Sequence, residues 1–124
     1  MQGLHLTADL YDCRCAPGLL TDTAALRDTL LGAVGACGLT GVAQLFHDFS
    51  AHGVPGSGST GVVLLAESHV AVHTWPERGA VTLDVYVCNF GADNSAKAHR
   101  LFDALLTAFA PARTVTHQIV RGDG

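Results

Sequence analysis

The chain has 124 residues, of which 48% are hydrophobic and 15% are charged, and its formal net charge is −4. This length suits one domain, and the apolar content excludes intrinsic disorder and leaves surface to be hidden in a core or a subunit interface. Seven Lys and Arg residues stand against eleven Asp and Glu residues. Without a clustered basic stripe, this balance argues against a nucleic-acid-binding protein.

The sequence also argues against a membrane or exported protein. Its longest uninterrupted apolar run, residues 62–66, is far shorter than the ~20 residues that span a bilayer. The first residues lack the basic segment and apolar stretch of an export signal. We therefore expect a cytoplasmic protein whose four cysteines are reduced thiols, although an even number would allow two disulfides.

Hydrophobic periodicity predicts six strands and two helices. Asp22 and its neighbours can cap the first helix, and Gly38 is placed to end it. Residues 93–95 can cap the second helix, which Pro111 ends. Residues 52–60 are rich in glycine and hydroxyl side chains and predict a loop. The expected strands are residues 4–11, 42–49, 61–66, 69–75, 80–88 and 114–120.

This order of elements, β-α-β-β-β-β-α-β with short connections in the middle, predicts an α+β fold. We expect a two-layer α/β sandwich, with a mainly antiparallel sheet and two helices on one face. The continuous apolar run at residues 61–66 is typical of a strand buried on both faces. The sheet face left open by the helices has enough apolar side chains to need a partner, so we expect a homodimer that packs sheet against sheet.

Reactive side chains concentrate in residues 67–77 and at Cys88. A metal site is one interpretation, because His69 and His73 share a strand face and Cys88 offers a thiolate, but no C-x-x-C pair accompanies them. A hydrolytic pair is another. However, Ser68 lacks a G-x-S-x-G turn, and pairing Cys88 with His73 requires a proximity that sequence does not establish. The third interpretation is structural: surface histidines, a buried serine and an inert thiol.

Three linked motifs decide between these interpretations: Glu67-Ser68-His69, then His73-Thr74-Trp75-Pro76-Glu77, then a strand that ends at Cys88. With the opening strand LHLTADLYDC, they resemble the short bacterial and archaeal form of the S-adenosylmethionine decarboxylase family. The agreement in strand and helix order extends over nearly the whole chain. The resemblance implies a pyruvoyl-dependent carboxy-lyase that is made as a proenzyme, or zymogen, and cuts itself.

The resemblance implies that the single domain, residues 1–124, is cut between Glu67 and Ser68. The Ser68 hydroxyl attacks the Glu67 carbonyl and turns the peptide bond into an ester. Loss of the Ser68 α-proton then expels the Glu67 carboxylate, and the remaining dehydroalanine hydrolyses to a pyruvoyl group. The products are a β chain of residues 1–67 and an α chain of residues 68–124.

The resemblance also assigns roles to the neighbouring side chains. His73 is the base that removes the Ser68 α-proton, and Thr60 lies where relatives often have a serine that assists this step. In catalysis the pyruvoyl ketone forms a Schiff base with the substrate amine and accepts the electrons released as CO₂ leaves. Cys88 then donates a proton to the product.

The implied reaction converts S-adenosylmethionine to decarboxylated S-adenosylmethionine, the aminopropyl donor of spermidine biosynthesis, and CO₂. Glu77 is expected to contact polar groups of the substrate. Trp75 and Phe49 are expected to pack against its adenine ring or its sulfonium, with core packing as their alternative. Two rival functions stay open: the same pyruvoyl chemistry on arginine or ornithine, and a non-catalytic paralogue that binds a metal or a partner protein.

One geometric difficulty accompanies these roles. Ser68 and His73 are an odd number of residues apart, so on an unbroken strand their side chains point to opposite faces. We therefore expect a bulge or turn near Ser68, where backbone strain would also favour the acyl shift. The resemblance further suggests that the active sites lie near the interface of the dimer.

Overall fold

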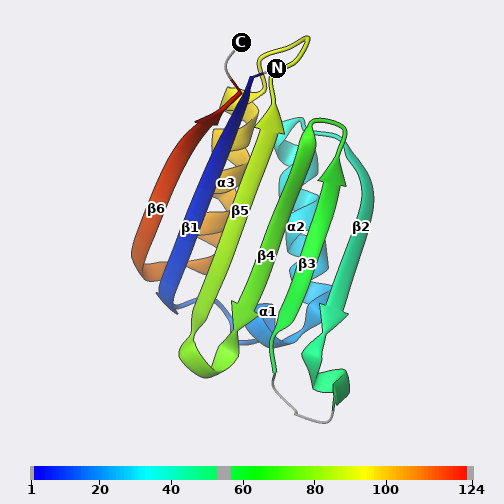
Figure 1. The fold of residues 1–124 in the computed structure, drawn as a ribbon. Helices are drawn as coiled ribbons and strands as arrows, with labels where there is room; N and C mark the ends of the chain where they lie inside the picture. Colours follow the sequence, from blue (N-terminus) through cyan, green and yellow to red (C-terminus); the bar gives the residue numbers. More distant parts are fainter. Residues whose placement is uncertain (1, 53–56, 123–124) are drawn as a thin grey trace.

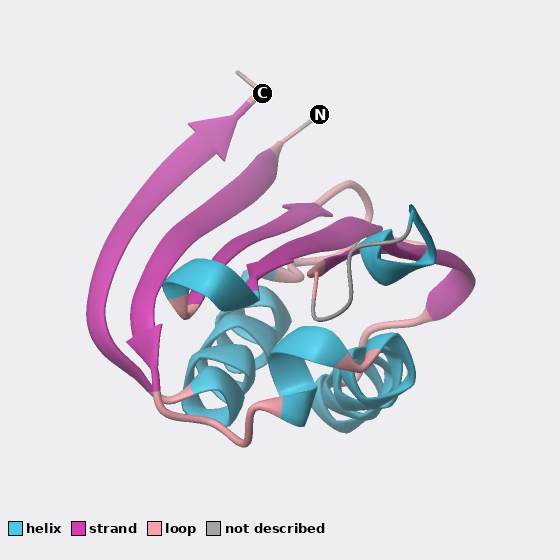
Figure 2. Ribbon diagram, turned by 90° about the horizontal axis from the view of Figure 1, so that it is seen from below, coloured by secondary structure: helices cyan, strands magenta, loops and turns pink. Residues whose placement is uncertain are grey.

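The computed structural model describes residues 2–52 and 57–122. Its strands form one six-stranded antiparallel sheet in the order β2-β3-β4-β5-β1-β6 (Figure 1). The helices lie together on one face of this curved sheet (Figure 2), which confirms the predicted α+β sandwich. The strands are β1 (Gly3–Cys13), β2 (Gly41–Asp48), β3 (Ser59–Leu65), β4 (Ser68–Trp75), β5 (Ala80–Cys88) and β6 (Pro111–Arg121). The helices are α1 (Gly18–Thr21), α2 (Thr23–Cys37) and α3 (Ser95–Phe109), with 3-10 turns η1 (Phe49–His52) and η2 (Pro76–Arg78).

The ends of α2 follow the predicted caps. The Asp22 carboxylate accepts hydrogen bonds from the N–H groups of Ala24 and Ala25, at 3.0 and 3.4 Å. Gly38 ends the helix with a φ of 86°, a left-handed conformation in which a side chain would be strained. The four-residue helix α1, just before this cap, was not predicted from the sequence.

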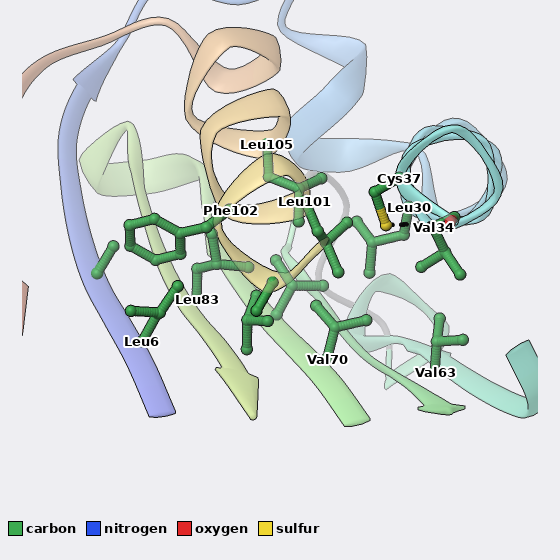
Figure 3. Close-up of a cluster of buried hydrophobic side chains, with 14 of the residues drawn as sticks. Leu6, Leu30, Val34, Cys37, Val63, Val70, Leu83, Leu101, Phe102 and Leu105 are labelled. Atoms are coloured by element: carbon green, nitrogen blue, oxygen red, sulfur yellow. Dashed lines mark hydrogen bonds between the residues drawn. The ribbon is translucent and has the colours of Figure 1, made fainter. Parts of the chain in front are cut away.

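The core lies between the sheet and the two long helices (Figure 3). The predicted apolar face of α3 is buried, and the buried side chains of β5 alternate as predicted. Full burial of a large apolar side chain contributes ~2–3 kcal/mol, so this layer holds both helices on the sheet. The core side chains labelled in Figure 3 are Leu6, Leu30, Val34, Cys37, Val63, Val70, Leu83, Leu101, Phe102 and Leu105.

Three sequence predictions need correction. The run at residues 61–66 is buried on one face only, with Leu64 46% exposed, because the helices cover one side of β3 and leave the other open. The predicted loop over residues 52–60 ends earlier, since Ser59 already belongs to β3; residues 53–56 of that loop lie outside the described residues. The last strand begins at Pro111, because the first residue of an edge strand needs no N–H for the ladder.

We call the sheet face that α2 and α3 do not cover the open face. Polar side chains cross it in rows, and large apolar ones are exposed on it between 37% and 72%. The apolar side chains lie toward both edges of the sheet, on β2, β3 and β4 and on β6, and offer apolar area for a partner to cover. These exposed apolar residues are Leu45, Leu64, Trp75, Val115 and Ile119. No helix in the described ranges is long and apolar enough to cross a membrane.

Candidate active site

The Glu67–Ser68 peptide bond lies where the hairpin of β3 and β4 turns. Leu65 pairs with Ser68, so Ala66 and Glu67 form a two-residue turn at the upper end of the sheet in Figure 1. Ser68 has a φ of 150°, a backbone conformation that residues with a side chain rarely adopt. The turn predicted near Ser68 is therefore present, but pairing is continuous from Ser68 to Trp75, so no bulge brings Ser68 and His73 to one face of β4.

Hydrogen bonds hold both ends of Glu67. Its backbone carbonyl accepts a bond of 2.7 Å from the N–H of Cys88, the last residue of β5. Its carboxylate accepts a bond of 3.1 Å from the N–H of Thr40, and the Thr40 carbonyl accepts a bond from the N–H of Ala66. The carbonyl of the Glu67–Ser68 bond is thus polarised by a fixed donor, and Cys88 lies directly beside it.

A second group of predicted site residues lies farther along the open face. Thr60 on β3 pairs with His73 on β4, and the Thr60 hydroxyl is 2.9 Å from Nδ1 of His73. His47 on β2 continues the same row, and its ring packs edge-on against Phe49 with 4.8 Å between the centroids. The predicted pairing of Thr60 with His73 therefore forms, and His47 connects it to Phe49.

The residues after His73 extend this group toward the lower end of the sheet in Figure 1. Trp75, the last residue of β4, is two positions beyond His73 and 46% exposed, so it is not a core residue. Glu77 is exposed in the η2 turn that follows. Phe49 is 43% exposed at the start of η1. Its position is fixed by the Asp48 carboxylate, which accepts bonds from the hydroxyl and N–H of Ser50; these bonds lower the pKa of Asp48.

The structure does not bring the two groups together within one chain. Ser68 and His73 are five residues apart on β4, a separation of ~16 Å at the rise of an extended strand. Cys88 and His73 are farther apart, because His73 pairs with Thr82, six residues before Cys88. The Cys88–His73 nucleophilic pair is therefore wrong for one chain. Within the described residues, no three potential metal ligands lie close together, which contradicts the metal interpretation of this cluster.

The other cysteines offer no comparable chemistry. Burial raises the pKa of the Cys13 thiol to about 11, with further contributions from Cys15 and Asp12. Burial also raises the pKa of Cys15. Cys37 is buried in the core, where its thiol donates a hydrogen bond of 3.1 Å to the Val34 carbonyl. Cys88 is the cysteine that the geometry singles out, because its N–H donates to the carbonyl of the Glu67–Ser68 bond.

Several residues that support the site were missed by sequence reasoning. Buried hydroxyl groups fix the start of β3: Ser59 bonds to Thr23 at 2.6 Å, and its N–H donates to Thr74 at 2.8 Å. On the open face, His5 lies 3.1 Å from the Asp84 carboxylate. No local motif marks these pairs, because their members are far apart in sequence. The alternation of polar residues on the first strand was the one available signal for His5.

Comparisons with known proteins agree with this geometry. A family model described as S-adenosylmethionine decarboxylase matches residues 4–122. The chain is 40% identical over 111 residues to the S-adenosylmethionine decarboxylase proenzyme of Aquifex aeolicus (strain VF5), covering 90% of this chain and 74% of that protein. It is 34% identical over 120 residues to the proenzyme of Archaeoglobus fulgidus, covering 97% of both.

The fold agrees as well. The crystal structure of the adenosylmethionine decarboxylase from Aquifex aeolicus superimposes with a TM-score of 0.84 at 38% identity, covering 98% of this chain and 92% of that chain. These relatives show the class of protein to which the chain belongs, a carboxy-lyase domain that is made as a proenzyme. The chain belongs to the S-adenosylmethionine decarboxylase family, whose general role is in the spermidine pathway.

Proposed function

We propose that this chain makes its own pyruvoyl cofactor by cutting itself between Glu67 and Ser68, and that it decarboxylates S-adenosylmethionine there. The observation that carries the proposal is the Glu67–Ser68 junction itself. It lies at a turn with a strained Ser68 φ of 150°, and its carbonyl is held by the Cys88 N–H at 2.7 Å. A pyruvoyl group formed from Ser68 fits this position, because cleavage at the turn would make residue 68 the first residue of a chain, next to Cys88.

Self-cleavage needs a polarised carbonyl and a nucleophile. When the Ser68 hydroxyl attacks the Glu67 carbonyl, negative charge develops on the oxygen to which the Cys88 N–H already donates. Collapse of this intermediate breaks the peptide bond and leaves Glu67 as an ester on the Ser68 oxygen. Release of the unusual backbone conformation of Ser68 favours the same shift.

The second step needs a base, and His73 of the same chain is too far away. Side chains stand roughly perpendicular to a sheet, so they do not close a gap of ~16 Å along one strand. A second copy of the chain therefore has to supply the base. Its His73, oriented by the Thr60 hydroxyl at 2.9 Å, takes the Ser68 α-proton as the Glu67 carboxylate leaves.

A homodimer through the open face satisfies this requirement. The Glu67, Ser68 and Cys88 group lies at one end of the sheet, and the Thr60 and His73 group lies toward the other. A two-fold axis between facing sheets brings the first group of one copy to the second group of its partner, and generates two identical sites. The apolar side chains exposed on this face supply the area that such an interface buries.

In the processed enzyme, the pyruvoyl group supplies the electron sink for decarboxylation. The chain's own residues bind the substrate and move its proton. The Glu77 carboxylate attracts a cationic substrate, while Trp75 and Phe49 offer exposed ring faces to an adenine or a sulfonium. The Cys88 thiol, beside residue 68, donates the proton that replaces CO₂.

Intact mass of the purified protein tests self-cleavage. We expect two fragments that divide at Glu67 and Ser68, and one uncut 12.9 kDa chain for Ser68→Ala. Cys88→Ala should still be cut, because the N–H that holds the carbonyl is retained, but should decarboxylate poorly. A wild-type chain that stays whole and resists hydroxylamine contradicts the proposal and favours a non-catalytic paralogue.

Release of labelled CO₂ from S-adenosylmethionine, arginine and ornithine tests the substrate. The names of the relatives favour S-adenosylmethionine over a basic amino acid. Activity on arginine or ornithine alone, in a correctly cut enzyme, overturns the substrate while leaving the self-cleavage intact.

A further inference from the structure

Tyr86 lies on the open face, where contacts from other strands hold its side chain, and the proposed mechanism does not use it. Its ring packs against the rings of His5 and His69, with centroids 5.6 and 5.8 Å away. The guanidinium of Arg121 lies 5.3 Å from the ring centroid, on the side of the edge strand β6. Contacts from three neighbouring strands therefore fix the direction of this side chain.

The ring lies over Gly3, which takes part in the first pair of the β1–β5 ladder. A Cβ added to Gly3 would lie 2.8 Å from the Val87 carbonyl oxygen, 2.9 Å from Cε1 of Tyr86 and 3.0 Å from the Tyr86 hydroxyl oxygen. Gly3 is buried although its missing side chain would point to the open face, because the tyrosine covers it. The phenol thus lies in a notch above Gly3 that it shares with the Val87 carbonyl, where a larger residue than glycine would clash with both.

This notch adjoins the thiol assigned above as the proton donor. Gly3 pairs directly with Cys88, and Cys88 contacts Glu67 on its other side. Cys88 therefore has Glu67 on one side and Gly3, covered by the Tyr86 ring, on the other, while residue 68 pairs with the preceding residue, Val87. One strand spacing, ~5 Å, separates Cys88 from Gly3.

We propose that Tyr86 is a positioning residue for Cys88, an inference that rests on the proposed function. The ring acts as a wall on the β1 side of Cys88. It removes the side-chain position in which the thiol leans over Gly3, and so keeps the sulfur on the side of residue 68. The ring and not the hydroxyl carries this role, since no described residue hydrogen-bonds the Tyr86 hydroxyl.

The wall matters because the proton has two possible destinations. Delivered to the substrate α-carbon, it gives the decarboxylated amine. Delivered to the carbon of residue 68, it ends turnover: the substrate nitrogen replaces the ketone oxygen, residue 68 becomes alanine, and the substrate leaves as an aldehyde and CO₂. A thiol kept away from Gly3 favours the first outcome.

The first experiment tests the wall without the cofactor, in the uncut Ser68→Ala chain. The rate at which iodoacetamide alkylates Cys88 is measured by peptide mapping, with and without the additional substitution Tyr86→Val. Valine suits a strand but is too short to reach Gly3. We expect about 1.5-fold faster alkylation, because three staggered positions become open instead of two. Tyr86→Phe should restore the original rate. Tyr11→Val, which removes a tyrosine with an arginine 4.0 Å from its ring at the far end of β1, should not change it.

The second experiment tests the role in the processed enzyme. N-terminal sequencing of the α chain detects alanine but not a pyruvoyl group, which blocks the reaction. After equal numbers of turnovers, Tyr86→Val should show about 1.5-fold more N-terminal alanine than the wild type, and Tyr86→Phe should match the wild type.

The outcomes of the two experiments separate the possible failures. Unchanged alkylation in the Ser68→Ala background overturns the wall, whatever the chain's function. Faster alkylation with unchanged alanine overturns the positioning role. A wild-type chain that is never cut contradicts the proposed function, and the alkylation result still decides the contact between Tyr86 and Cys88.

Discussion

Self-cleavage should be restored when two inactive variants are produced in the same cell. Ser68→Ala removes the nucleophile but keeps the base, and His73→Ala removes the base but keeps the nucleophile. The ~16 Å between these positions on β4 means that neither chain can complete the reaction alone. A mixed dimer holds one complete site, formed by Ser68 of one copy and His73 of the other.

The expected yield follows from pairing. With equal amounts and random assortment, about half of the dimers are mixed, and each contains one cleavable chain in a complete site. About half of the His73→Ala chains should therefore be cut. Alone, the same chain lacks its general base, and its cleavage should slow by ~10²–10⁴-fold.

Different affinity tags on the two variants allow denaturing electrophoresis and intact mass to report which chain is cut. His99→Ala, which changes an exposed histidine on α3, is the matched control and should be cut normally on its own. If the mixture yields no cut chain although mixed dimers are isolated, the base does not come from the second copy. Normal cleavage of His73→Ala alone would refute its role as base.

Three further predictions concern single sites. Thr60→Val removes the hydroxyl 2.9 Å from His73 and should lengthen the half-time of cleavage up to ~10-fold, whereas Thr60→Ser should cleave normally, as intact-mass time courses can check. Gly61→Ala would put a Cβ 2.2 Å from the Phe46 ring, so urea titration should show a loss of ~1–3 kcal/mol that Phe46→Leu partly relieves. Burial raises the pKa of Cys13 from 9.0 to about 11, so its stabilising contribution is complete below pH 9 and lost as pH rises toward 11. The urea midpoint should fall over that range less in Cys13→Ala than in the wild type; an equal fall would refute this linkage.

The elements that sequence predicted best are those whose periodicity matches burial on one side. The apolar residues of α3 recur at helical spacing and all face the core, and β5 alternates between the helices and the open face. The run at residues 61–66 gave a wrong prediction of burial on both faces, because apolar residues on both faces of a strand do not show which face is covered. In this chain α2 covers one face of β3, and Leu64 stays exposed on the other.

The candidate site divides in the same way. The motifs singled out Ser68, His73 and Cys88, and the odd spacing predicted a turn or bulge near Ser68, of which the turn is present and the bulge is not. Spacing along one chain could not reveal that the Cys88 N–H would meet the Glu67 carbonyl, because strand pairing decides that contact. The same ladder sets His73 beside Thr60, which is far from the turn.

Strand β4 connects these observations. It begins with Ser68 at the turn and carries His73 five residues later, so one strand separates the proposed nucleophile from the proposed base. If the base comes from the second copy, a chain without a partner cannot form the cofactor. Decarboxylase activity then requires an earlier encounter between two chains through the open face. The apolar side chains exposed there consequently serve the chemistry as well as the stability of the assembly.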